Sequence, residues 1–154
     1  MTPFELKLTT GRWSGAQFPE EPTTGPALMA LHGFSGAGLD FESLIPELRE
    51  IGHFVAPDLP GHGTHLSSSA SADDWMSGLH DFASEAFRRP FLLLGYSMGG
   101  RLALHFALRY PHLVDGLILV GTTAGIEDGS EREARQESDE TLAAWIESNG
   151  VQAF

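Results

Sequence analysis

Short apolar runs recur along the first 124 residues, and longer amphipathic segments separate them. Continuous apolar character over so few residues is typical of strands that are buried in a parallel sheet. Near the N-terminus, apolar and polar residues alternate over Phe4–Thr9, which predicts a half-exposed strand at an antiparallel edge. The following stretch, 11–26, is rich in Gly, Pro and Thr and predicts turn or loop. The four predicted buried strands are Ala27–Leu31, His53–Pro57, Phe91–Leu94 and Leu117–Val120.

Apolar residues at helical spacing predict a helix after each of the first three buried strands. Asp40 can cap the first of these helices, and Ser71 or Asp73 can cap the second. Strands that alternate with helices in this way define the α/β class, with a mostly parallel sheet and helices on both faces. The three helices are expected over residues 40–52, 71–87 and 98–110.

The composition changes after residue 124, where acidic residues become frequent. Helical spacing of apolar residues continues from Ala134 to Asn149, and Gly150 can end that helix. We therefore expect two parts: a core over 1–124 and a separate helical segment over 125–154 that lies over the reactive edge of the sheet.

Composition and charge limit the classes of partner. The net charge of −12 argues against binding to nucleic acid or to an anionic membrane surface, although it leaves a small anionic substrate possible. The chain has no cysteine, which excludes disulfides and thiolate metal sites. No signal-peptide pattern opens the sequence, and no apolar run reaches the length of a membrane span. A cytoplasmic location is expected.

The most specific chemical pattern is Gly-Tyr-Ser-Met-Gly at 95–99, which follows a predicted buried strand and opens a predicted helix. In this setting G-x-S-x-G indicates a nucleophile elbow, a sharp turn that holds a serine out of the sheet. Ser97 is the expected nucleophile or proton-relay hydroxyl. Met98 follows it, so its backbone N–H can stabilise a developing oxyanion. Tyr96 precedes it and can line a pocket.

The histidines have more ordinary interpretations. His32 and His62 follow predicted strands and are expected to hold loops by hydrogen bonds, as is Asp58. The candidates for a substitute general base among the histidines are His62 and His65. Histidine spacing typical of a metal site is absent, so we expect no metal.

Three loops, in this order along the chain, resemble those of the α/β-hydrolase superfamily. They are Leu31-His32-Gly33-Phe34, Asp58-Leu59-Pro60-Gly61-His62-Gly63 and Gly95-Tyr96-Ser97-Met98-Gly99-Gly100. The resemblance covers roughly residues 4–124. It implies an oxyanion hole formed by the backbone N–H groups of Phe34 and Met98.

A narrower resemblance is to the 2-succinyl-6-hydroxy-2,4-cyclohexadiene-1-carboxylate synthases of menaquinone biosynthesis, which eliminate pyruvate from a cyclohexene polycarboxylate. Its basis is the elbow sequence 95–103 together with Glu-Arg-Glu-Ala-Arg at 131–135, which is similar to the start of that family's cap. It implies that Arg101 and Arg135 bind substrate carboxylates, with Arg132 and Tyr96 as further candidates, and that no cofactor is needed.

The sequence departs from the superfamily pattern in one respect. The superfamily places an acid and then a histidine after the serine, but no histidine follows His112 here. We therefore expect a chain truncated at its C-terminus, in which Ser97 lacks its base. Two alternatives to the synthase stay open: a carboxylic-ester or C–C-bond serine hydrolase, and a non-catalytic fragment. Such a fragment would associate with itself or with a missing C-terminal half.

Overall fold

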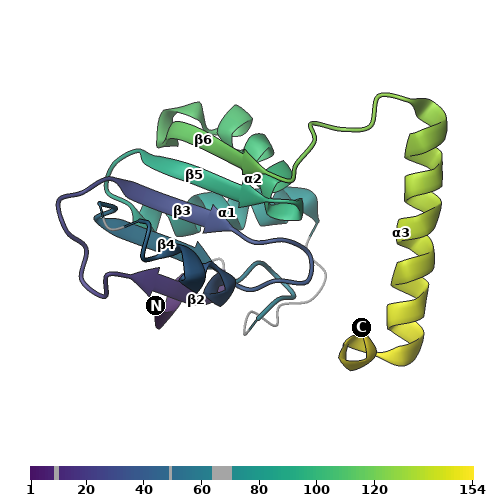
Figure 1. The fold of residues 1–154 in the computed structure, drawn as a ribbon, viewed down its shortest axis with the longest axis horizontal. Helices are drawn as coiled ribbons and strands as arrows, with labels where there is room; N and C mark the ends of the chain where they lie inside the picture. Colours follow the sequence, from purple (N-terminus) through teal and green to yellow (C-terminus); the bar gives the residue numbers. More distant parts are fainter. Residues whose placement is uncertain (9–10, 49, 64–70) are drawn as a thin grey trace. The chain divides into compact units, whose positions relative to one another are not determined.

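The computed structural model describes residues 1–8, 11–48, 50–63 and 71–154. Its contacts divide the chain into two units, Met1–Thr122 and Thr123–Phe154. The larger unit holds the sheet and its helices, and the smaller holds one long helix (Figure 1). No helix in the described part of the chain is long and apolar enough to cross a membrane.

A six-stranded sheet organises the larger unit, in the order β1-β2-β4-β3-β5-β6. The first two strands form an antiparallel hairpin, and β2 joins it antiparallel to β4; the other pairings are parallel. The mostly parallel α/β fold is therefore confirmed, including the antiparallel edge. The strands are β1 (Thr2–Leu8), β2 (Gly11–Phe18), β3 (Ala27–Leu31), β4 (His53–Pro57), β5 (Phe91–Tyr96) and β6 (Val114–Val120).

Helices cover both faces of this sheet. On one face Phe82 and Phe106 pack from α1 and α2 against Leu93 in the larger apolar core. On the other face Phe41 packs from η1 against Phe54. The helices are η1 (Gly38–Leu44), α1 (Ala72–Ala86), α2 (Met98–Arg109), η2 (Pro111–Leu113), α3 (Gly129–Asn149) and η3 (Val151–Ala153).

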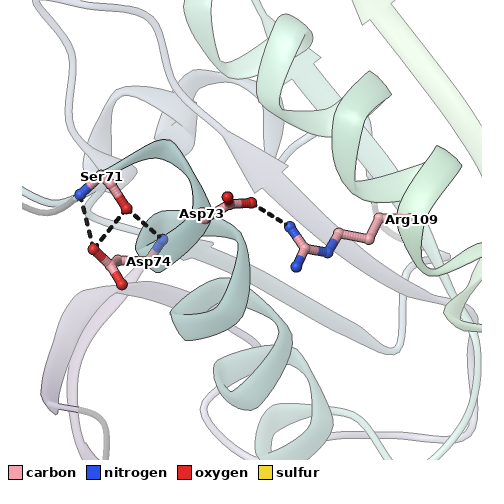
Figure 2. A network of polar contacts seen from close by, with 4 residues as sticks. All are labelled: Ser71, Asp73, Asp74 and Arg109. Carbon is pink, nitrogen blue, oxygen red and sulfur yellow. Dashed lines mark hydrogen bonds and ion pairs between the residues drawn. The ribbon is translucent and has the colours of Figure 1, made fainter.

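Polar contacts fix the start of α1 (Figure 2). The Ser71 hydroxyl accepts the N–H of Asp74 at 3.2 Å, and the Asp74 carboxylate accepts the N–H of Ser71 at 2.9 Å. This reciprocal pair is a capping box, so the predicted Ser71 cap is confirmed. Asp73, in the first turn, pairs at 2.7 Å with Arg109 in the last turn of α2. Both side chains are solvent-exposed, so this ion pair adds little stability.

Two predicted elements were wrong. The stretch 11–26 contains β2, in which Gly15 serves strand packing rather than a turn: a Cβ there would lie 2.2 Å from the Ala56 carbonyl oxygen of β4. The predicted helix 40–52 is instead the short 3-10 helix η1, which begins before Asp40. Asp40 accepts the Ala37 N–H at 2.9 Å from inside the helix, and Pro46 lacks the N–H that further helix would need.

The smaller unit consists mainly of α3. Asp128 caps this helix by accepting the Glu131 N–H at 2.9 Å, and Gly150 ends it with φ +81°. None of its residues is buried. The predicted helix and its glycine stop are confirmed, whereas its role as a cap stays a prediction.

The edge strand β6 leads us to predict self-association. It pairs with β5 on one side, and no described strand pairs with the other. Ile118, Leu119 and Val120 in this strand are 41%, 40% and 46% exposed. An apolar strand edge favours pairing with another chain. Sedimentation should therefore show a mass that rises with concentration, and Ile118→Lys should lower it. Val151→Lys, at an exposed position outside the sheet, is the control; a monomer at every concentration would contradict this prediction.

Candidate active site

The candidate site lies where the loops after β3 and β4 approach the turn after β5. A Cβ built on Gly33 would lie 3.1 Å from the Tyr96 ring and 3.6 Å from the Ser97 Cβ. The N–H of Leu59, in the loop after β4, donates to Nε2 of His32 at 2.9 Å. The structure thus brings together the three loops that carry the sequence motifs, as expected for the carboxyl ends of adjacent parallel strands.

Ser97 has the backbone of a strained elbow. Its φ of +52° makes it the one non-glycine residue with positive φ in the described ranges. Its N–H donates to the Val120 carbonyl at 2.9 Å, and its own carbonyl accepts the N–H of Gly100 at 3.1 Å. A non-glycine residue held in such a conformation is typical of functional sites, because the surroundings must compensate for the strain.

A close contact between α2 and β3 fixes the position of the elbow. A Cβ on Gly99 would lie 2.2 Å from the Leu31 carbonyl oxygen and 2.5 Å from that of His32. The second glycine of the motif therefore lets the start of α2 press directly on the end of β3, which carries the Phe34 loop.

Sequence reasoning missed Thr122, which supports the elbow from the end of β6. Its hydroxyl lies 3.1 Å from the carbonyl oxygen of Ser97 and 3.2 Å from that of Val120, so its single proton is shared between two acceptors. Only the position of this threonine just after the fourth predicted strand could have drawn attention to it.

The two predicted oxyanion donors occupy different elements. Met98 is the first residue of α2, where an N–H has no acceptor within the helix and the helix dipole is positive. Phe34 lies in the loop after β3, and its side chain is 50% exposed. Their joint action on an oxyanion stays a prediction.

Asp58 and His32 hold loops, as the sequence predicts. The Asp58 carboxylate accepts the Gly38 N–H at 2.9 Å and the Ser14 hydroxyl at 3.2 Å, so it joins the loop after β4 to both η1 and β2. His32 is buried, and burial lowers the pKa of its ring below the ordinary 6.5, although a bond to the Gly33 carbonyl opposes this shift. His53 has a lowered pKa for the same reason of burial.

These two lowered pKa values predict acid destabilisation. Below about pH 6.5 the unfolded chain binds protons at His32 and His53 that the folded chain does not bind, so folding stability falls as the pH drops. Urea unfolding should give a lower midpoint at pH 5.5 than at pH 7.5. Replacing His53 by Phe should reduce that difference, whereas replacing the exposed His112 by Gln should not. Equal midpoints at the two pH values would contradict the prediction.

No general base contacts the nucleophile within the described ranges. No side chain there makes a hydrogen bond to the Ser97 hydroxyl, and no group of His, Asp or Glu there could hold a metal ion. His62 turns both ring nitrogens toward backbone carbonyls, which fits a loop-holding role better than that of a base. His65, the other candidate, lies outside the described residues.

The predicted substrate-binding residues fall in both units. Tyr96 ends β5 and is 51% exposed beside the Gly33 backbone. Arg101 lies in the first turns of α2, is exposed, and forms no ion pair with any described residue. Arg132 and Arg135 belong to α3 of the smaller unit. There Arg135 pairs with Asp139 at 2.8 Å, and Arg132 donates to the Ile126 carbonyl.

The fold and the elbow define an α/β-hydrolase-type protein, and comparison with known families agrees. The model of the alpha/beta hydrolase fold family matches residues 26–149, so this chain belongs to that family.

Within the family, the chain is similar to 2-succinyl-6-hydroxy-2,4-cyclohexadiene-1-carboxylate synthases. The identity is 36% over 123 residues with the enzyme of Enterobacter sp. (strain 638), covering 79% of this chain and 46% of the relative. It is 34% over 138 residues with that of Yersinia pestis (strain Pestoides F), covering 83% and 48%. The solved structure of MenH from S. aureus superposes with a TM-score of 0.78 at 27% identity, covering 92% and 53%. The chain therefore spans about half the length of these relatives.

Proposed function

We propose that this chain supplies the serine and the oxyanion hole of a 2-succinyl-6-hydroxy-2,4-cyclohexadiene-1-carboxylate synthase in menaquinone biosynthesis. The observation that carries the proposal is the strained elbow at Ser97 within a chain that is 34–36% identical to such synthases. The synthase relatives favour pyruvate elimination over ester hydrolysis, which uses the same elbow.

The proposed chemistry begins at the ring carbon that carries the succinyl group, next to the carbonyl of that group. Ser97 relays the proton from this carbon to a general base, and the C–H electron pair forms a new C=C bond. The ring C=C bond already present shifts by one carbon, the C–O bond on the carbon next to the far end of that former double bond breaks, and its electron pair leaves on the oxygen of the enol form of pyruvate. Enolate-like charge develops on the oxygen of the succinyl carbonyl during proton removal. Preorganised N–H groups of Phe34 and Met98 would stabilise that charge in the transition state.

Arg101 is the residue best placed in the larger unit to bind a substrate carboxylate. It follows Ser97 by one helical turn, and a guanidinium can bind a carboxylate through two parallel hydrogen bonds. Its lack of an ion pair with any described residue fits this role. Arg135, Arg132 and Tyr96 are proposed as further substrate contacts, where Arg135 would exchange its bond to Asp139 for one to the substrate.

Replacing Arg101 by Lys should raise KM for the polycarboxylate substrate on the order of tenfold, because a lysine keeps the charge but loses the paired hydrogen bonds. Replacing it by Ala should raise KM further. Steady-state release of pyruvate measures both effects. Arg12→Lys, on the exposed hairpin where Arg12 faces Glu5 at 3.6 Å, is the matched control. An unchanged KM in Arg101→Ala would remove Arg101 from the substrate site.

A further inference from the structure

Two histidines contact the backbone of the Phe34 loop and take no part in the chemistry proposed above. His32 directly follows β3 and His62 lies in the loop after β4, with their ring centres 5.1 Å apart. Each ring contacts backbone groups of the loop that carries the expected oxyanion donor Phe34. These contacts act on the two peptide groups that flank Phe34.

The first of these peptide groups joins Gly33 to Phe34. Its carbonyl accepts Nδ1–H of His32 at 2.8 Å and the Gly36 N–H at 3.1 Å. A peptide group is planar, with its C=O and N–H pointing in opposite directions. Two bonds that fix the direction of the Gly33 carbonyl therefore also fix the direction of the Phe34 N–H.

The second peptide group joins Phe34 to Ser35. Its carbonyl lies 2.5 Å from Nε2 of His62, whose Nδ1 lies 3.1 Å from the Pro60 carbonyl. Carbonyl oxygens only accept hydrogen bonds. The shorter contact, to the Phe34 carbonyl, therefore requires that Nε2 of His62 carries a proton. With both flanking peptide groups held, Phe34 has little freedom to rotate about its own φ and ψ.

The protonation of His32 is set from the loop after β4. Leu59 donates its N–H to Nε2 of His32 at 2.9 Å, so Nε2 must be unprotonated and Nδ1 must carry the proton. Burial favours this neutral ring, which agrees with its lowered pKa. Leu59, His32 and Gly33 thus form a chain of hydrogen bonds from one loop to the next.

We propose that His32 and His62 are positioning residues that together fix the direction of the Phe34 N–H toward the Ser97 elbow. The catalytic consequence rests on the proposed function, whereas the geometry can be tested without any turnover. In this arrangement the loop after β4 acts on the Phe34 loop through the bond from Leu59 to His32 and through the His62 ring.

A pair of amide substitutions at His62 tests the proposal on the full chain. The side-chain nitrogen of Gln reaches about where Nε2 stands, and that of Asn about where Nδ1 stands. His62→Gln should keep the bond to Phe34, and His62→Asn should lose it while remaining chemically similar. The NMR carbonyl shift of Phe34 should move only in the Asn variant. Amide exchange over residues 33–36 should then become about fivefold faster.

A control and an activity measurement complete the test. His105→Asn, at an exposed position on α2, should change neither the carbonyl shift nor the exchange rate. In the pyruvate assay His62→Asn should lower kcat on the order of tenfold with KM nearly unchanged, and His62→Gln should restore it. Equal carbonyl shifts and exchange rates in the Asn and Gln variants would overturn the proposal. Absence of turnover in the wild type would count only against the proposed function.

Discussion

Replacing Ser97 by Ala is expected to lower kcat for pyruvate elimination by about 1,000-fold or more, with little change in KM. The Ser97 hydroxyl is the group that relays the proton in the proposed chemistry, whereas substrate binding depends mainly on other residues. Steady-state pyruvate release measures the loss. Ser77→Ala, at an exposed position of α1, is the matched control and should keep full activity.

A second substitution separates strain from chemistry at the same residue. Ser97 has φ +52° and ψ −113°, a backbone conformation that glycine adopts at lower cost. Ser97→Gly should therefore be as inactive as the Ala variant, yet about 1 kcal/mol more stable than the wild type in urea unfolding. Wild-type activity in either variant would show that the elbow serine is not the reacting group.

Replacing Gly99 by Ala is expected to lower the free energy of unfolding by about 3 kcal/mol or more. The new Cβ would lie 2.2 Å and 2.5 Å from two backbone oxygens at the end of β3, and neither oxygen belongs to a flexible side chain. Relief therefore requires α2 or β3 to move, which would also disturb the Ser97 elbow.

Urea unfolding followed by circular dichroism measures the effect of the Gly99 substitution. Gly129→Ala is the matched control, because a Cβ there would meet no atom closer than 3.9 Å, at the start of α3. That control should be neutral or slightly stabilising. If Gly99→Ala were as stable as the wild type, the close approach of α2 to β3 would be wrong.

The parallel part of the fold could be predicted from the sequence because each buried strand is a continuous apolar run. The N-terminal region was harder. In β2, Gly15 resembles a turn residue, but it is a strand residue whose small size permits close approach to Ala56. This role depends on Ala56 in β4, which lies 41 residues further along the chain. The residues around Gly15 in the sequence therefore do not indicate it.

The candidate site could likewise be predicted from the sequence only where its residues are neighbours in the chain. The motif placed Ser97, Met98 and Tyr96 correctly on one turn, since these residues are neighbours in the chain. Thr122 was missed because its contact with Ser97 spans 25 residues and threonine is common at strand ends. The contact between His62 and the Phe34 carbonyl likewise joins two separate loops. The sequence therefore predicts that His62 holds a loop, but it does not identify the carbonyl that His62 contacts.

Pyruvate release by the polypeptide encoded by the full reading frame tests the central claim most directly. With the cyclohexene polycarboxylate as substrate, the account predicts one pyruvate released for each cyclohexadiene formed, and loss of this release in Ser97→Ala. Hydrolysis of p-nitrophenyl acetate that depends on Ser97, without any release of pyruvate, would contradict the synthase assignment and indicate an ester hydrolase.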